Sequence, residues 1–304
     1  MSNLNLEKIT VVFVSFRSSD HLNRLFSNLI EKADSPEIIK FLIVDNTNGE
    51  DENLPTSIPD NLNYSIIPNE GEGLQRSISH SSALDKGLKN SETEFTLLVD
   101  PDIHVFKKGW DTFCLKQFHT NDKMVIGAPY PIWKLGKVHD YPSVVFMFFK
   151  TELVQSFKKS FYPFPGNLKR IWNSIIRKIV RLGGIGNKYR LNQFQILRYF
   201  CGFLENITGI TAPDTGKEII ETFRQHQFQT ITFKTPYPYN FDEKEEKPFF
   251  DIARDFEIYF QIDDPFLTHM YSSGVYHWRT EKGSDKAYWQ TLITHIENGL
   301  RKEK

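Results

Sequence analysis

Two carboxylates separated by a proline, Asp100 and Asp102, form the pattern in this sequence that most clearly points to chemistry. They lie in VDPDIHVFKKGWD, residues 99–111, directly after an apolar run that is typical of a buried strand. Proline fixes its own φ and drives the preceding residue toward an extended conformation, so this turn is stiff. Two hard oxygen ligands on a stiff turn suit Mg²⁺ or Mn²⁺, completed by phosphate oxygens. The alternative is an ordinary turn after a strand.

Strands and helices alternate over roughly the first hundred residues, and they must position this turn. Apolar segments at 9–16, 38–44, 63–68 and 94–99 indicate strands, and the spacing at 21–33 and 79–89 predicts helices. This alternation predicts an α/β fold with a doubly wound, mostly parallel central sheet and helices on both faces. Ligands of such sheets bind beyond the carboxyl ends of the strands, where Asp45, Asp100 and Asp102 stand.

The sequence after Gly109 is less regular. Residues 124–130 and 143–149 are expected strands, the second of them antiparallel, and 230–233 a further short strand. The charged stretch 242–248 is expected to be a solvated loop. We find no internal repeat and no low-complexity tract in the sequence.

Composition excludes several classes of protein. The 304 residues carry 37 Lys plus Arg against 38 Asp plus Glu, so no overall charge favours nucleic acid as a partner. Cys114 and Cys201 lack the spacing of a zinc site or of a disulfide framework. The start, Met1 to Thr10, has no apolar core of a signal peptide, and no stretch approaches the roughly 20 apolar residues of a membrane span. We therefore expect a cytoplasmic protein, which leaves open peripheral contact with the inner face of the membrane.

Five segments, in order, resemble the large family 2 of glycosyltransferases, which have the GT-A fold. They are VVFVSFRSSDHLNRLFSNL, LIVDNTNGED, the Asn-Glu-Gly loop at 69–71, HSSALDKGL and LLVDPDIHVFKKGWD. The resemblance covers residues 9 to about 115. It implies a metal-dependent, inverting hexosyltransferase that uses a nucleotide-sugar donor and a glycan or lipid-linked acceptor in surface polysaccharide biosynthesis. It also implies a nucleotide-sugar-binding half, 1–115, and a less regular acceptor and catalytic half, 116–304.

The resemblance assigns roles to residues of the first half. It implies that Ser15 and Phe16 lie by the nucleotide base, that Asp45 contacts base or ribose, and that His80 lies near ribose or diphosphate. Asp100 and Asp102 would be the DxD pair, with Asp102 the direct ligand of Mn²⁺ or Mg²⁺. Two simpler readings stay open: Asp45 caps the next loop, or His80 is an ordinary residue near a helix start.

The second half supplies candidates for the catalytic base and for a third metal ligand. Asp214, in TAPDTGKEIIETF, is the preferred base, although Asp is also a favoured helix N-cap. Its reserves are Glu205, Asp263 and Asp264. His269 is the preferred third ligand and His277 the second choice, and either could be an ordinary buried or surface histidine. Trp133, Trp278 and Tyr130 are candidates for stacking on a sugar ring or are simply core.

The segment 167–190 is basic and amphipathic. Its apolar residues fall on one helical face, and five cations between Lys169 and Arg181 have no acid among them. Such a helix lies in an anionic membrane interface, or it packs its apolar stripe on the core with a solvated basic face.

Two rival functions also remain: a nucleotidyltransferase with a similar sheet, and a non-catalytic glycan-binding protein with a degenerate transferase fold.

Overall fold

The computed structural model describes residues 8–71, 74, 76–164, 166–211, 214–270 and 285–302. The chain forms two compact units that interleave along the sequence. The first unit comprises 1–129, 140–163 and 214–232, and the second comprises 130–139, 164–213 and 233–304. The division into a nucleotide-sugar-binding half, 1–115, and an acceptor and catalytic half, 116–304, describes function rather than compactness, and it stays a prediction.

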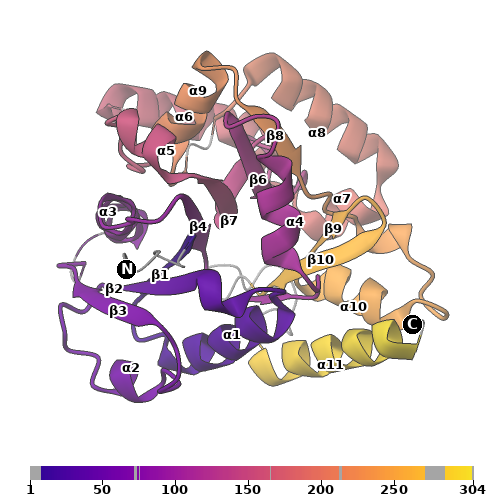
Figure 1. The fold of residues 1–304 in the computed structure, drawn as a ribbon. Helices are drawn as coiled ribbons and strands as arrows, with labels where there is room; N and C mark the ends of the chain where they lie inside the picture. Colours follow the sequence, from indigo (N-terminus) through magenta and orange to yellow (C-terminus); the bar gives the residue numbers. More distant parts are fainter. Residues whose placement is uncertain are drawn as a thin grey trace. The chain divides into compact units, whose positions relative to one another are not determined.

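A seven-stranded sheet forms the centre of the first unit (Figure 1). In spatial order its strands are β3 (Tyr64–Pro68), β2 (Ile39–Asp45), β1 (Ile9–Ser15), β4 (Phe95–Val99), β7 (Pro142–Lys150), β6 (Met124–Pro129) and β8 (Gln229–Thr232). Strand β7 is antiparallel to both neighbours, and the other pairs are parallel. The predicted α/β class, the mostly parallel sheet and the antiparallel strand at 143–149 are confirmed.

Helices α1 (Ser19–Lys32) and α3 (Arg76–Lys89) cover opposite faces of this sheet. The Phe13 ring of β1 packs edge-on against Phe26 of α1 at a centroid distance of 5.2 Å. On the other face, a Cβ added to Gly87 of α3 would lie 2.4 Å from Cγ1 of Val12. Successive residues of a strand point to opposite faces, so Val12 and Phe13 separate the two helices. Gly87 lets α3 approach the sheet closely.

Short elements complete the first unit. They are a 3₁₀ turn (Pro36–Ile38), α2 (Asn53–Thr56), β5 (Ile103–Val105), α4 (Trp110–Gln117), α5 (Thr151–Ser156) and α9 (Lys217–Gln225). Buried Asp111 of α4 accepts hydrogen bonds from the amides of Asp34 and Ser35, at 2.8 and 2.9 Å. The acid that ends the motif 99–111 therefore ties α4 to the segment after α1.

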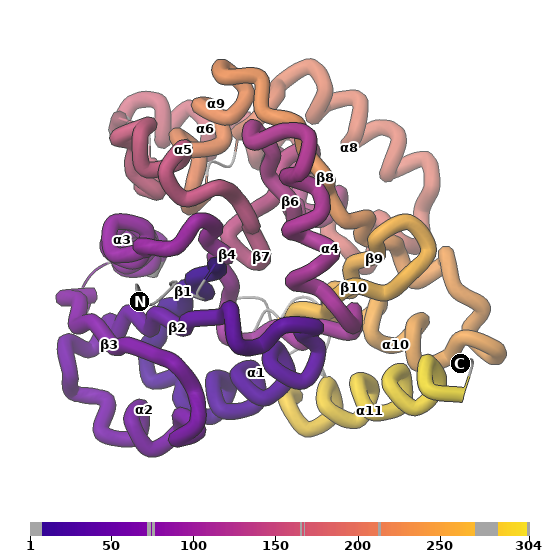
Figure 2. The backbone as a smooth tube through the Cα atoms, in the orientation of Figure 1, coloured from indigo at the N-terminus to yellow at the C-terminus, as the bar shows by residue number. Residues whose placement is uncertain are grey.

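The second unit is mainly helical. Its elements are α6 (Asn167–Val180), a 3₁₀ turn (Leu182–Gly184), α7 (Lys188–Gln193), α8 (Gln195–Thr208), a 3₁₀ turn (Pro238–Asn240), α10 (Lys247–Asp255), β9 (Glu257–Gln261), β10 (Asp264–His269) and α11 (Lys286–Lys302). A single residue, Phe194, separates α7 from α8, and Figure 2 traces the long path of α8. Strands β9 and β10 pair antiparallel. Residues 242–247 are exposed, as expected of a solvated loop, but α10 already begins at Lys247.

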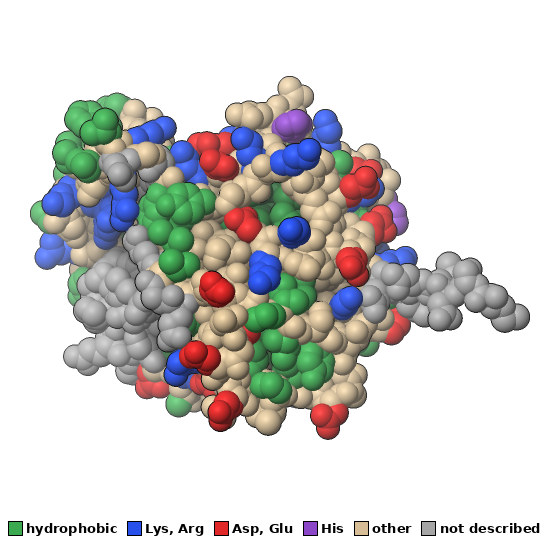
Figure 3. Space-filling view, turned by 90° about the vertical axis from the view of Figure 1, so that its left-hand side faces the viewer, with side chains coloured by type: hydrophobic (Ala, Val, Ile, Leu, Met, Phe, Trp, Pro, Cys, Tyr) green, Lys and Arg blue, Asp and Glu red, His purple; other side chains and the backbone are tan. Residues whose placement is uncertain are grey.

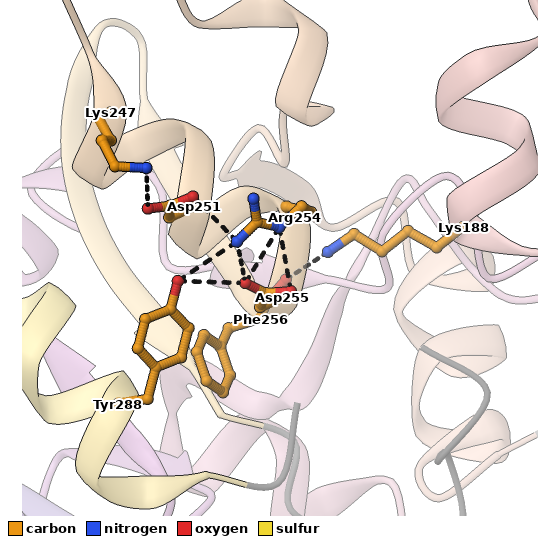
Figure 4. Close-up of polar contacts among 7 residues, drawn as sticks. All are labelled: Lys188, Lys247, Asp251, Arg254, Asp255, Phe256 and Tyr288. Atoms are coloured by element: carbon orange, nitrogen blue, oxygen red, sulfur yellow. Dashed lines mark hydrogen bonds and ion pairs between the residues drawn. The ribbon is translucent and has the colours of Figure 1, made fainter. Parts of the chain in front are cut away.

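A polar network joins three helices of the second unit (Figure 4). Arg254 donates to Asp255 at 2.6 Å, and the Tyr288 hydroxyl of α11 lies 3.3 Å from the same carboxylate. The Lys188 ammonium of α7 donates to the Phe256 carbonyl at 2.6 Å. Burial and the neighbouring carboxylates raise the pKa of Tyr288 to about 12. No helix in the described ranges is long and apolar enough to cross a bilayer.

Candidate functional site

The carboxyl ends of β1, β2 and β4 meet at one edge of the sheet. Ser15 at the end of β1 is in register with Asp45 at the end of β2. Val99, the last residue of β4, is in register with Phe13, so Asp100 continues the chain at the same edge. Three of the predicted site residues therefore reach one edge, because parallel strands end together there.

His80 and Asp100 lie side by side at this edge. Nε2 of His80, near the start of α3, is 3.6 Å from Oδ1 of Asp100, and both side chains are partly exposed. The pair becomes an ion pair when the imidazole is protonated. The structure thus brings together two residues that the sequence placed in the same ligand site.

Asp45 is buried and shapes the loop that follows β2. Its Oδ1 accepts from the Thr47 amide at 2.9 Å and from the Thr47 hydroxyl at 2.7 Å. Its Oδ2 accepts from the Gly49 amide at 2.8 Å. These bonds are those of the loop-capping role, while contact of Asp45 with a nucleoside stays a prediction.

A network of small polar side chains joins the loop 69–71 to the start of α3. Asn46 donates from Nδ2 to the Ser79 carbonyl at 3.2 Å and to the Ser79 hydroxyl at 3.1 Å. Its Oδ1 accepts from Nδ2 of Asn69 at 2.7 Å, and its carbonyl accepts from the Gly71 amide at 3.2 Å. This network fixes the helix start that carries His80. The sequence marked Asn69 and Gly71 but not Asn46, which stands next to the more conspicuous Asp45.

Asp102 is 9% exposed and has a partly buried cation beside it, Arg24 of α1. Arg24 donates to the Ile103 carbonyl, and its Nη1 lies 3.3 Å from Nδ1 of His104. Burial lowers the pKa of Arg24 to about 10, against the opposing effect of the Asp102 carboxylate, so the guanidinium is still charged at neutral pH. Arg24 therefore holds the residues after Asp102 against α1. A single arginine inside an amphipathic helix gave no signal in the sequence.

Ser15 and Phe16, at the end of β1, differ in exposure and in chemistry. The Ser15 side chain is fully buried, and among the described residues its hydroxyl has no hydrogen-bond partner. Leaving a buried hydroxyl unpaired costs about 1–3 kcal/mol, so this group favours a polar ligand. The next residue, Phe16, is 49% exposed and presents an aromatic surface.

Asp214 lies just before α9 in the first unit, and it is not the N-cap of that helix. The N-cap is Gly216, which has φ of 90°, while Oδ1 of Asp214 accepts from the Thr215 amide at 2.9 Å. The Gly216 amide donates to the Phe161 carbonyl at 2.8 Å, and the Phe161 amide donates to Asp85 of α3 at 2.8 Å. The loop of Asp214 is therefore anchored to α3, which also carries His80.

His269, at the end of β10, belongs to the second unit and is buried against a carboxylate. Its Nδ1 lies 3.0 Å from Oε2 of Glu257 on β9, which also pairs with Lys134 at 2.8 Å. An ionised carboxylate only accepts, so Nδ1 carries a proton, and in the neutral imidazole Nε2 carries the lone pair. Histidines that bind metals often donate their other ring N–H to a carboxylate, which fixes the orientation of the ring, and His269 has this arrangement with Glu257. His277 and Trp278 lie outside the described residues.

The three other candidates for the catalytic base, Glu205, Asp263 and Asp264, lie in different surroundings in the second unit. Oε1 of Glu205 accepts from the Gly136 amide and lies 3.1 Å from Nε2 of His139, whereas Asp263 and Asp264 are exposed around the turn between β9 and β10.

Two aromatic candidates for stacking on a sugar are buried. Trp133 lies in a small core and packs against Tyr237 at 5.1 Å between ring centroids, and Tyr130 is also buried. Cys114 and Cys201 are both buried and free.

Comparison with known proteins finds similarity only at the level of solved structures. No protein-family model matches the chain, and no curated protein matches it. Mannosyltransferase PcManGT from Pyrobaculum calidifontis, solved with GDP-Man and Mn²⁺, is 12% identical over 49% of this chain and 46% of that chain, with a TM-score of 0.40. S. aureus TarS 1–349 is 19% identical over 53% and 51%, with a TM-score of 0.37. The same protein in complex with UDP-GlcNAc is 18% identical over 51% and 48%, with a TM-score of 0.36. The chain thus spans about half the length of the structures that it matches.

Proposed function

We propose that this chain is a metal-dependent glycosyltransferase. The proposed reaction moves a hexose-type sugar, with inversion, from a nucleotide-diphosphate sugar to a hydroxyl of a glycan or lipid-linked acceptor, in surface polysaccharide biosynthesis. The observation that carries the proposal is the Asp100-Pro101-Asp102 turn. It begins at the sheet edge where β1 ends at Ser15 and β2 ends at Asp45. The proximity of His80 to Asp100 supports it.

The proposed metal site uses Asp102 as direct ligand and Asp100 beside it. Carboxylate oxygens are the ligands that Mn²⁺ and Mg²⁺ prefer, so the side chains of the turn fit either ion. Such an ion, when bound, stabilises the negative charge that develops on a diphosphate leaving group. We propose His269 as third ligand. Its support is the Glu257 carboxylate, 3.0 Å from Nδ1, which fixes Nε2 as the coordinating nitrogen.

The proposed donor site lies at the ends of β1 and β2 and at the start of α3. The unpaired Ser15 hydroxyl would gain a hydrogen bond from a base or ribose, and exposed Phe16 offers a ring for stacking. Asp45 would act on the nucleoside partly by shaping the loop through its bonds to Thr47 and Gly49. His80 is proposed to donate toward ribose or diphosphate when protonated.

Asp214 is the proposed general base. It would take the proton of the acceptor hydroxyl as that oxygen attacks the anomeric carbon. Two features support it: Asp214 is not used as the helix N-cap, and its loop is anchored through Phe161 to α3.

The proposal is tested by thermal shift and turnover with UDP, GDP, CDP and dTDP and their sugars, each with and without Mn²⁺. A nucleotide at about 100 times its Kd stabilises the folded protein by about 2.7 kcal/mol. Asp102→Asn should lose the Mn²⁺-dependent part of that shift and the sugar transfer, each measured against the melting temperature of the unliganded variant itself. Asp60→Asn, which removes an exposed carboxylate elsewhere in the first unit, is the matched control and should change neither.

Three outcomes would contradict the proposal. Full Mn²⁺-dependent stabilisation and turnover in Asp102→Asn would remove the metal site. Release of pyrophosphate instead of a nucleoside diphosphate would favour the nucleotidyltransferase. Absence of stabilisation by every nucleotide, together with binding of glycans, would favour the non-catalytic glycan-binding protein.

A further inference from the structure

Exposed apolar side chains gather on α6 and α8 of the second unit. Of the twenty large apolar residues that are exposed in the described ranges, thirteen lie between 168 and 207. Leu168 and Ile196 are each 85% exposed, and Trp172 is 62% exposed. Monomeric soluble proteins rarely leave so much contiguous apolar surface in water, and such patches mark interaction sites. We call the exposed surface of residues 168–207 the α6–α8 face.

The apolar stripe of α6 is only partly used by the core. Its C-terminal part contributes Val180, with Ile176 packed beside it, to the small core around Trp133. Ile171 and Ile175, on the remaining part of the helix, are 61% and 47% exposed. The packing alternative for segment 167–190 therefore accounts for one end of α6 and leaves most of its apolar stripe in solvent.

Helix α8 repeats this division and lengthens the surface beyond residue 190. Cys201 is part of the small core, with Leu197 and Leu204 packed against it. Ile196, Phe200, Phe203 and Ile207 form a second stripe at the spacing of a helix and are all exposed. Helices α6 and α8 pack against each other, so their exposed stripes belong to one surface.

The α6–α8 face is also strongly basic. Residues 168–207 contain eight Lys and Arg and one acid, Glu205, although the whole chain has a net charge of −1. Lys188 is buried, and the seven that are exposed or partly exposed are Lys169, Arg170, Arg177, Lys178, Arg181, Arg190 and Arg198. Figure 3 shows basic and apolar side chains intermingled on the side of the molecule that carries α6. Cations around exposed Trp and Tyr are typical of helices that lie in an anionic lipid interface.

We propose that the α6–α8 face docks this protein on the surface of an anionic lipid bilayer. The exposed side chains of Leu168, Trp172 and Ile196 enter the headgroup region, and the basic residues pair with lipid phosphates. A second copy of the chain is a poorer occupant, because a symmetric dimer would place the seven exposed or partly exposed cations of one copy opposite those of the other. This inference goes beyond the proposed function, since docking holds whatever sugar the enzyme transfers.

The test is flotation of the full chain with vesicles of phosphatidylcholine alone or with about one third phosphatidylglycerol. The protein should float only with the anionic vesicles, and salt should weaken its binding because it screens charge. A fourfold variant, Lys169→Gln, Arg170→Gln, Arg177→Gln and Lys178→Gln, should bind at least about 100-fold more weakly. The matched control changes four exposed lysines elsewhere: Lys89→Gln, Lys108→Gln, Lys116→Gln and Lys123→Gln. It should bind like the parent protein.

A second pair of variants tests the apolar contribution. Ile196→Ser should weaken binding, whereas Ile262→Ser, at a residue 68% exposed in the turn between β9 and β10, should not. Trp172→Phe should reduce the quenching of tryptophan fluorescence by brominated lipid while the protein still floats. Failure to float with anionic vesicles, or equal loss in the face variants and their controls, would overturn the proposal. A dimer in sedimentation analysis that Ile196→Ser abolishes would overturn it in favour of a second copy. All these readouts are independent of sugar transfer.

Discussion

Replacing Gly71 by alanine should disconnect the start of α3 from the end of β2. A Cβ at this position would lie 2.5 Å from the Ser79 hydroxyl and 2.6 Å from Cγ of Asn46. Real Cβ atoms essentially never approach so closely, so Asn46 must move. It would then lose its hydrogen bonds to Ser79 and to Asn69. At about 0.5–1.5 kcal/mol for each of three bonds, the free energy of unfolding should fall by about 2–4 kcal/mol.

The assay is thermal unfolding followed by nucleotide binding. For a protein of this size the loss corresponds to a melting temperature lowered by roughly 3–6 °C. Asn46→Ala removes the same bonds without adding an atom, so its cost should be similar. Gly299→Ala is the control, because Gly299 lies in α11 with open space around it and alanine favours a helix by about 1 kcal/mol. A Gly71→Ala protein that melts within 2 °C of the parent, or an Asn46→Ala protein that is unaffected, would refute the reasoning.

Three further perturbations follow from two buried residues, Asn28 and Gly127, and from the partly buried Tyr288. Asn28→Ala should lower the free energy of unfolding by about 2–4 kcal/mol in urea titrations, because Asn28 bonds both the amide and the carbonyl of Val105 at 2.7 and 3.0 Å. Gly127→Ala should fail to yield folded protein in circular dichroism, since its Cβ would lie 1.8 Å from the Phe146 carbonyl oxygen inside the sheet. The pKa of Tyr288 is raised to about 12, so its contribution to stability is complete below pH 10 and is lost as pH rises from 10 through 12. Between pH 8 and pH 11 the free energy of unfolding, measured by urea titration, should therefore fall more in the parent protein than in Tyr288→Phe. Equal falls in the two proteins would contradict this.

The first unit could be predicted from the sequence because its strands carry their own signal. The run from Ile9 to Ser15 is buried along its whole length, so both faces of the strand are apolar in sequence as in the structure. Once several strands are parallel, the sheet places their carboxyl ends together, and the positions of Asp45 and Asp100 follow. The prediction needed no long-range contact to be known.

The second unit was harder to predict because its helices are determined by packing. Helix α8 has large aromatic and β-branched residues among its 14, which favour strands as much as helices. In the first unit the same limit applies to α9: the sequence named Asp214 as a possible helix N-cap, whereas the N-cap is Gly216, whose partner lies 55 residues away in the chain. The Gly216 amide bonds the Phe161 carbonyl, which no local pattern predicts.

The three acids at the sheet edge, Asp45, Asp100 and Asp102, have different neighbours in the structure. Asp45 accepts three hydrogen bonds from its own loop, so its charge is already stabilised by the protein. Asp100 lies next to an imidazole that is charged only when protonated, and Asp102 has the cation of Arg24 beside it. The three carboxylates of this edge therefore lie in different electrostatic surroundings, and Asp45 is the one that shapes the adjoining loop. The metal-binding role of Asp100 and Asp102 is the proposal that the Asp102→Asn variant tests.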